Sequence, residues 1–563
     1  MTRLEMKARG WDELDVLIIT GDAYMDHPAF GAAVIGRVLE AEGWRIGLIA
    51  QPDWTKPESL TGMGRPRLFC GITAGNLDSM LSHYTAARRK RKDDAYTPGG
   101  RTGKRPNLAG VVYTQLAKKA FPGGRTVLGG IEASLRRTAH YDYWQDKLRP
   151  SILMDSKADL LVYGMGERAI REIARRIADQ QPLEGIPGTA RLLGGKEAAE
   201  PEGSNVIHLP SFEECQADKK AVLELTHLTE REQNPFTGKA LVQFHGARAV
   251  RIEPPARPLT TAEMDRVYEL PYLRRPHPCY SEAVPAFTMI KESVTVVRGC
   301  GGGCTFCGLG LHQGRFLTSR SEDSVAREVK TMAAMPSFSG TVTDLGGPTA
   351  NLYGCANGVC DACKVCRRAS CLYPKICPNL ELDAAAAIRL MKRVREVTKV
   401  KHVFIQSGIR MDVALRHPKY IRELARHHVS GRLKVAPEHM HPKVLQKMRK
   451  PGPETFKEFQ KTFEAESRAA GKRQHLVPYF ISNFPGSTEA EMKAVERFVR
   501  EGERALQQVQ DFIPLPMTPA AAVYYTGLDY ETGEPVPVVR GLAERRTQMK
   551  QLRPVLNESS RSR

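Results

Sequence analysis

The sequence predicts an α/β protein with two successive domains, a doubly wound domain followed by a parallel (β/α)6 partial barrel. Apolar segments of strand length alternate with segments of helical periodicity in both halves of the chain. Glycines follow many of the predicted strands. A chain of 563 residues is also longer than a single hydrophobic core normally supports.

The N-terminal domain is predicted from strands at 15–21, 45–52, 126–130 and 158–166, with helices at 31–44 and from Gly166 onward. This alternation is typical of a doubly wound fold, which we expect to occupy residues 1–181. Residues 182–290 are rich in proline and polar side chains. We expect them to form a connector that wraps the domains.

A basic segment, residues 84–107, lies between two of these strands. It contains glycines and eight cations, Arg88, Arg89, Lys90, Arg91, Lys92, Arg101, Lys104 and Arg105. The segment is interpreted either as a solvated loop or as a phosphate-binding loop.

The barrel is predicted over 291–520, with a C-terminal tail at 521–563. Its strands are expected at 293–299, 340–347, 401–408, 432–438, 475–486 and 509–516. Loops after the carboxyl ends of barrel strands carry the chemistry of such folds. Polar residues and glycines at or near those ends are Asp344, Gly346, Gly347, Ser407, Arg410 and Glu438.

Composition indicates a metal-binding protein outside the membrane. Nine of the 12 cysteines lie between residues 300 and 377, which favours metal ligation over disulfides in a reducing compartment. The chain has no apolar run long enough for a bilayer, and its start lacks a signal peptide's hydrophobic region. We therefore expect a cytoplasmic protein. The net charge of +20 favours an anionic partner, such as nucleic acid.

The segment RGCGGGCTFCGLGLHQG, residues 298–314, places Cys300, Cys304 and Cys307 in a glycine-rich loop after the first barrel strand. Three thiolates at this spacing can surround an iron-sulfur cube and leave one iron without a protein ligand. The alternative is a structural zinc site completed by a distant residue such as His312.

This loop resembles the signature of the radical S-adenosylmethionine (SAM) superfamily, including Phe306 directly before Cys307. The chain as a whole is similar to YgiQ-type proteins. The similar stretches are TGDAYMDHPAFG (20–31), MDRVYELPY (264–272), HQGR (312–315), VAPEHMHPKVLQKMRKP (435–451) and QDFIPLPMTPAAAVYYTG (510–527).

The resemblance implies that Cys300, Cys304 and Cys307 bind a [4Fe-4S] cluster whose open iron chelates SAM. It implies that Gly346 and Gly347 receive the SAM amino group, with Asp344 replacing the usual acidic residue, which is Pro348 here. Strand position places Ser407, Arg410 and Glu438 near the ribose or carboxylate of SAM. The enzyme would cleave SAM to a 5'-deoxyadenosyl radical, with electrons from a reductant such as flavodoxin or ferredoxin.

A second group of cysteines follows the second barrel strand, in an insertion at 351–379. It comprises Cys355, Cys360, Cys363, Cys366, Cys371 and Cys377. These thiols are interpreted as an auxiliary iron-sulfur or zinc site, or as reduced structural or redox-active cysteines.

The N-terminal domain resembles the cobalamin-binding domains that precede some radical SAM barrels. However, DHPAFG (26–31) departs from the D-x-H-x-x-G spacing that supplies a cobalt ligand, so cobalamin stays an open alternative. Two other functions stay open. VLQKMRKP and FPG are similar to stretches of radical SAM tRNA methylthiotransferases, and a non-catalytic cluster protein would act in sensing.

Overall fold

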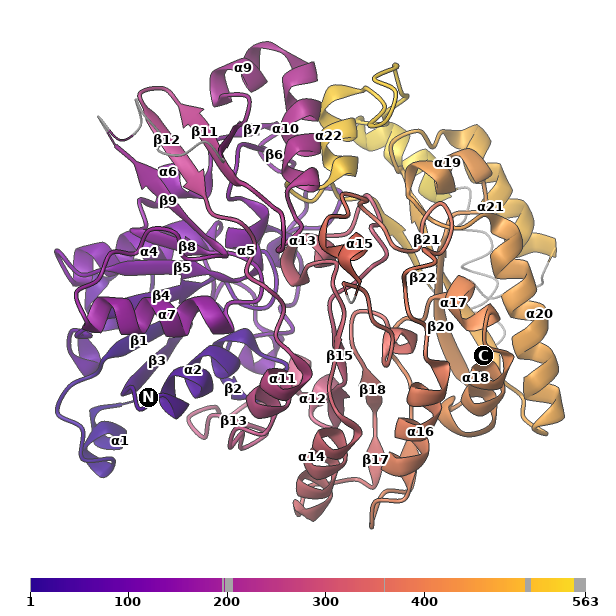
Figure 1. Cartoon of the computed structure of the whole chain (residues 1–563), viewed down its shortest axis with the longest axis horizontal. Helices are drawn as coiled ribbons and strands as arrows, with labels where there is room; N and C mark the ends of the chain where they lie inside the picture. The colour runs from indigo at the N-terminus through magenta and orange to yellow at the C-terminus, as the bar shows by residue number, and fades with distance from the viewer. Residues whose placement is uncertain (1, 195–196, 198–205, 359, 502–507, 551–563) are drawn as a thin grey trace. The chain divides into compact units, whose positions relative to one another are not determined.

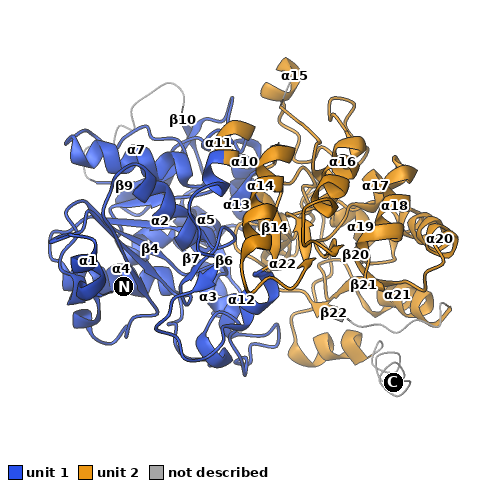
Figure 2. Ribbon diagram, turned by 90° about the horizontal axis from the view of Figure 1, so that it is seen from below, with its two compact units in different colours: residues 1–259, 266–291, 311–314 blue, residues 260–265, 292–310, 315–563 orange. Residues whose placement is uncertain are grey.

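The N-terminal half of the chain folds around a nine-stranded sheet (Figure 1). The computed structural model describes residues 2–194, 197, 206–358, 360–501 and 508–550. They fall into two units (Figure 2). Unit 1 comprises 1–259, 266–291 and 311–314, and unit 2 comprises 260–265, 292–310 and 315–563.

Five parallel strands form the doubly wound part of unit 1. Their order across the sheet is β3 (Ile46–Ala50), β1 (Val16–Thr20), β4 (Phe69–Thr73), β5 (Thr126–Gly129) and β8 (Leu160–Val162). All five side chains of β1 are buried, as expected for a parallel strand covered on both faces. This arrangement confirms the predicted α/β fold class.

Helices cover both faces of these strands. Helix α2 (Gly31–Ala41) and α7 (Glu167–Ala178) share one apolar cluster with Val127 of β5. The side chain of the next residue, Leu128, faces α4 (Ala109–Ala120) and lies close to Gly110. Because successive strand residues point to opposite faces, α4 lies on the other face from α2 and α7.

The expected connector is corrected by the structure, because much of residues 182–290 extends the sheet of unit 1. Strands β9 (Thr189–Leu193), β12 (Arg248–Ile252) and β11 (Ala240–His245) are antiparallel neighbours beyond β8, and β10 (Val206–His208) pairs with β11. The turn between β11 and β12 contains Gly246, whose φ of 60° suits a tight hairpin.

Unit 2 contains a strand in each of the six regions expected for the barrel. Strand β14 (Ser293–Thr295) is parallel to β18 (Asp344–Gly346), and β17 (Thr341–Val342) is parallel to β19 (His402–Val403). The remaining regions form a parallel sheet of β20 (Arg432–Glu438), β21 (His475–Ser482) and β22 (Gln508–Asp511).

Apolar helix faces fill the core of unit 2. Val325 and Val329 of α14 (Glu322–Ala334) share a cluster with Leu390 of α16 (Ala384–Arg395). Phe456, Phe459 and Phe463 lie on one face of α20 (Pro453–Ala469) in the same cluster. Their spacing of three and four residues places all three side chains toward the strands.

The expected tail, 521–563, is integrated into unit 2 over its described part. Helix α22 (Pro519–Thr526) crosses the expected boundary, and its Tyr524 is buried. Arg545 is also buried and donates to Asp511 of β22 at 2.7 Å. Within the described residues, every helix is too short or too polar to traverse a bilayer.

Candidate metal centre

The three-thiol loop begins at a backbone position that only glycine accepts. Gly299 follows β15 (Val297–Arg298) with a φ of 85°, and an added Cβ would lie 1.9 Å from the Phe316 carbonyl oxygen. A Cβ on Gly302 would lie 3.3 Å from the Cys300 sulfur and 3.7 Å from the Cys304 sulfur. The two thiols therefore approach the same point of the loop.

Thr305 anchors the centre of this loop to two distant segments of unit 2. Its hydroxyl donates to the Lys447 carbonyl at 2.8 Å, at the end of α19 (Pro442–Lys447), and its amide donates to Met448. Its own carbonyl accepts from the Ala520 amide of α22 at 3.0 Å. Two of the similar stretches, 435–451 and 510–527, thus meet at the cysteine loop.

Arg410 lies beside the thiols, and its orientation is set by a carboxylate. Its Nη1 is 3.9 Å from the Cys304 sulfur, while Nε and Nη2 donate to the two Asp412 oxygens at 3.0 and 2.7 Å. Both side chains are largely buried. The bidentate pair fixes the guanidinium plane, so one nitrogen stays directed at the sulfur.

A second buried pair lies within electrostatic range of the same thiol. Lys450 Nζ is 3.8 Å from Glu438 Oε1, and Glu438 has a φ of 69° at the end of β20. Burial raises the pKa of the Glu438 carboxyl, although Lys450 and Arg410 act to lower it. Burial also raises the pKa of the Cys304 thiol, although the same two cations act to lower it.

Burial raises the pKa of Cys307 to about 12. A metal would deprotonate such a thiol, because coordination replaces the proton. Sulfur donors suit iron-sulfur clusters, and the positive charge of Arg410 balances the anionic thiolates. The residues present therefore fit a [4Fe-4S] cluster.

Within the described ranges, no three or more His, Cys, Asp and Glu side chains are arranged to hold a metal ion. In a [4Fe-4S] cluster each thiolate binds a different iron, so its ligands need not meet around one ion. His312, the expected completing ligand of a zinc site, belongs to unit 1, where its Nδ1 is 2.9 Å from the Ser134 hydroxyl.

The glycines after the second strand are required by packing within unit 2. A Cβ on Gly346 would lie 2.2 Å from the Ser407 hydroxyl, and one on Gly347 would lie 2.3 Å from the Val297 carbonyl oxygen. Asp344 Oδ1 accepts the amides of Gln406 and Ser407 at 2.8 and 3.0 Å, and its Oδ2 accepts the Ser407 hydroxyl. Asp344 and Ser407 thus bond to each other across neighbouring strand ends.

Phe306 is half-buried and packs edge-on against Phe484, with ring centroids 6.3 Å apart. This contact orients the side chain that precedes Cys307.

Sequence reasoning missed Thr305, Lys450, Asp412 and Thr349. Of these, Thr349 has its hydroxyl 4.0 Å from the Cys300 sulfur. Lys450 lies inside the similar stretch 435–451, and Asp412 lies two residues after Arg410, so proximity in sequence was an available signal.

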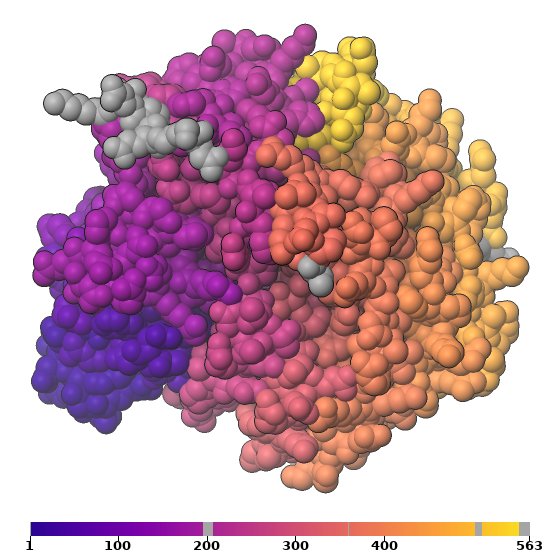
Figure 3. All heavy atoms as spheres, viewed as in Figure 1, coloured from indigo at the N-terminus to yellow at the C-terminus, as the bar shows by residue number. Residues whose placement is uncertain are grey.

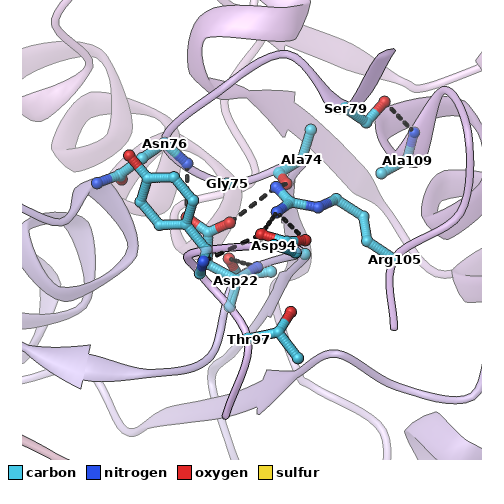
Figure 4. A network of polar contacts seen from close by, with 12 residues as sticks. Asp22, Ala74, Gly75, Asn76, Ser79, Asp94, Thr97, Arg105 and Ala109 are labelled. Carbon is cyan, nitrogen blue, oxygen red and sulfur yellow. Dashed lines mark hydrogen bonds and ion pairs between the residues drawn. The ribbon is translucent and has the colours of Figure 1, made fainter. Parts of the chain in front are cut away.

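In unit 1, charged side chains fill the point between β1 and β4 where the strand order reverses, the usual ligand crevice of such sheets (Figure 4). Arg105 is fully buried there, and donates to Asp22 at 2.8 Å and to both Asp94 oxygens. Asp22 also accepts the Asn76 amide at 2.7 Å. Arg105, one of the eight cations of the basic segment, is thus committed to internal ion pairs.

His27, in the stretch that departs from the cobalt-ligand spacing, is buried inside unit 1. It is 1% exposed, and its Nδ1 accepts the Ala29 amide at 3.1 Å. Burial, with a smaller contribution from Arg274, lowers the pKa of its imidazole well below the usual value. The ring is therefore packed inside unit 1, where it makes edge-on contacts with the rings of Phe30 and Phe287.

Two solved structures of the radical SAM methyltransferase TsrM from Kitasatospora setae share the fold. The one with tryptophan substrate and a SAM analogue has a TM-score of 0.52 at 14% identity, over 96% of this chain and 88% of that chain. The one with cobalamin and a [4Fe-4S] cluster has a TM-score of 0.50 at 15% identity, over 90% of this chain and 76% of that chain.

Family models match both halves of the chain. Residues 1–293 match the family Radical SAM N-terminal, and residues 294–499 match the Radical SAM superfamily. A UPF0313 protein of Geobacter sulfurreducens is 51% identical, over 97% of this chain and 91% of the relative. The UPF0313 protein YgiQ of Escherichia coli is 44% identical, over 94% of this chain and 79% of the relative. The chain therefore belongs to the UPF0313 (YgiQ) family of radical SAM proteins, as the resemblance predicted.

Proposed function

We propose that this protein is an enzyme that cleaves SAM reductively to methionine and a 5'-deoxyadenosyl radical, which removes hydrogen from a substrate. Membership of the radical SAM superfamily implies binding of a [4Fe-4S] cluster and SAM. When bound, the cluster would supply the electron and a coordination position for the amino and carboxylate groups of SAM.

One observation carries the proposal, namely the convergence of cysteine thiols with a buried cation at the carboxyl end of the first barrel strand. Cys300 and Cys304 flank Gly302, and the Arg410 guanidinium lies 3.9 Å from the Cys304 sulfur. A positive charge fixed in low dielectric stabilises thiolate and favours an added electron nearby. Asp412 keeps the guanidinium in that position.

The remaining polar groups suit recognition of a zwitterionic amino acid end. Lys450 and Glu438 lie 3.8 Å apart and are both largely buried. An opposite-charge pair of this kind can exchange partners with a carboxylate and an ammonium group of a ligand. We assign SAM positioning to this pair and to Arg410.

Cleavage without added substrate tests the proposal. Anaerobically reconstituted full-length protein, given SAM and dithionite or reduced flavodoxin, should release methionine and 5'-deoxyadenosine slowly. Replacing Cys300, Cys304 and Cys307 with alanine should abolish the release. Cys279→Ala is the matched control, because Cys279 is exposed and lies in unit 1.

An intact cluster with no SAM cleavage under several reductants would refute the enzymatic role and favour a sensing protein. With cleavage established, deuterium transfer from labelled cell fractions into 5'-deoxyadenosine identifies the substrate class. Labelled RNA is one such fraction, because the net charge of +20 makes RNA the alternative substrate.

The two glycines are unsuitable as probes of SAM binding. A Cβ on Gly347 would lie only 2.3 Å from the Val297 carbonyl oxygen. This overlap is present whether or not SAM is bound. Loss of activity in Gly347→Val would therefore report loop distortion. Arg410 and Lys450 are better targets, because their side chains can be neutralised without adding volume.

A further inference from the structure

The insertion contains a ferredoxin-like run of cysteines. Cys360, Cys363 and Cys366 follow the spacing C-x2-C-x2-C, Cys371 comes next, and Cys377 precedes a proline. Bacterial ferredoxins use C-x2-C-x2-C as three successive ligands of [4Fe-4S] centres. Structural zinc sites instead use C-x2-C or similar pairs separated by a longer stretch. The spacing favours an iron-sulfur cluster.

Cys355 precedes the ferredoxin-like spacing and lies in an apolar cluster, against which Cys371 and Cys377 also pack. Cys355 is buried among Leu352, Leu372 and Leu380, and its thiol donates to the Asn351 carbonyl at 3.9 Å. Its surroundings are those of a packed structural cysteine. Because Cys355 lies outside the ferredoxin-like spacing, it serves as a control for Cys360, Cys363 and Cys366.

Two thiols of the ferredoxin-like spacing lie in contact. Helix α15 (Asp361–Lys364) brings the Cys360 and Cys363 sulfurs to 3.4 Å. Asn357 contacts the Cys371 sulfur and also donates to the Arg315 carbonyl at 2.9 Å. Arg315 in turn donates to the Cys366 carbonyl. Asn357 and Arg315 thus connect the Cys371 thiol with the backbone of Cys366.

Hydrogen-bond donors and a cation surround these sulfurs. The Arg368 amide donates to Cys366 Sγ at 3.4 Å, and Asn357 Nδ2 donates to Cys371 Sγ at 3.3 Å. Arg315 donates to the carbonyls of Cys366 and Arg368. Bonds to sulfur and nearby positive charge are the features by which proteins stabilise anionic clusters.

The insertion is attached directly to the loop of the first three thiols. The Cys371 amide donates to the Gly301 carbonyl at 2.8 Å, and the Ser370 hydroxyl donates to the Gly302 carbonyl at 2.8 Å. The insertion also reaches the surface, where Val365 is 64% exposed (Figure 3). A centre held here would lie between solvent and the first cluster loop.

We propose that the insertion binds a second [4Fe-4S] cluster through Cys360, Cys363, Cys366 and Cys371. The cluster is assembled independently of the first centre, because no ligand is shared. The proposal does not depend on SAM cleavage, since a non-catalytic protein of this fold would hold the same second cluster.

The test is metal analysis of anaerobically reconstituted full-length protein. Wild-type protein should bind about eight irons and about eight sulfides per chain, as two [4Fe-4S] clusters by Mössbauer spectroscopy. The triple variant of Cys300, Cys304 and Cys307 to alanine should retain about four irons, as should the triple variant of Cys360, Cys363 and Cys366. Cys371→Ala should also lose the second cluster, whereas Cys355→Ala and Cys279→Ala should lose none.

Wild-type protein that binds about four irons, with zinc or a Cys360–Cys363 disulfide in the insertion, would overturn the proposal. This measurement needs no variant, so a misfolded mutant cannot obscure it. Retention of about eight irons after removal of Cys360, Cys363 and Cys366 would also overturn it.

Discussion

Gly303→Ala should detach the cysteine insertion from the first cluster loop. Gly303 has a φ of 61°, and an added Cβ would lie 2.5 Å from the Ala369 carbonyl oxygen and 2.8 Å from the Ser370 Cβ. The first contact is with backbone, so it cannot be relieved by a side-chain rotation. The insertion must move away from the loop by several tenths of an ångström.

The expected cost follows from two contributions. A non-glycine residue at positive φ costs about 1 kcal/mol. Movement of the insertion also weakens the hydrogen bonds from Ser370 to Gly302 and from Cys371 to Gly301, both 2.8 Å. Each is worth about 1 kcal/mol, so the attachment loses about 2 kcal/mol beyond the backbone term.

Amide hydrogen exchange measures this loss at the site. A loss of about 2 kcal/mol should accelerate exchange of the Cys371 amide about 30-fold, when opening is local. Gly314→Ala is the matched control, because Gly314 has a φ of 80° but nothing within 4 Å of an added Cβ. Equal exchange of the Cys371 peptide in the two variants would refute the proposed attachment.

Two further predictions concern charge. Arg410→Gln removes a cation 3.9 Å from the Cys304 sulfur. That contact is worth at most about 4 kcal/mol, and partial neutralisation by Asp412 and spreading of cluster charge reduce it, so the cluster's midpoint potential should fall by about 50–100 mV. Potentiometry with Arg410→Lys as the charge-retaining control checks this, and an unchanged potential in Arg410→Gln would contradict it. Asp15→Asn tests the ion pairs of the carboxylate that directly precedes β1. Burial alone would raise the pKa of Asp15, but hydrogen bonds from Arg45 and Arg67 lower it from 3.8 to about 2. The ionised carboxylate therefore stabilises the folded state above pH 4 by about 2 kcal/mol, and this contribution disappears as the pH falls through 2. Denaturant unfolding at pH 7 and pH 3 should show a smaller difference between wild type and Asp15→Asn at pH 3, and a pH-independent difference would refute the assignment.

The fold class was predictable because both units repeat a local pattern. Each predicted barrel region contains a strand, and β1, β3, β5 and β8 lie within the predicted N-terminal strands. By contrast, residues 182–290 were expected to be a connector, and they supply strands β9 to β12 of the sheet. The proline and polar residues of this region suggested a connector, whereas β9, β11 and β12 are internal, mostly buried strands of the sheet.

The roles of the two glycines and of Asp344 were not readable from spacing. The motif predicted contact with SAM, whereas the folded chain shows their packing against Ser407 and Val297. Those partners come from other strands, so their distances depend on how the strands pair. SAM contact at these positions stays a prediction.

The sequence by itself determined the chemistry available to this protein, because ligand type and local spacing are properties of contiguous residues. The three-thiol loop and the cysteine-rich insertion are visible in this way. Only the tertiary structure decided which groups meet. It places Arg410 beside Cys304, Thr305 against α19 and α22, and Ser370 on the cluster loop, and it buries Cys355 in an apolar cluster. These contacts join residues far apart in the chain, and they form only when burial of apolar faces brings the segments together.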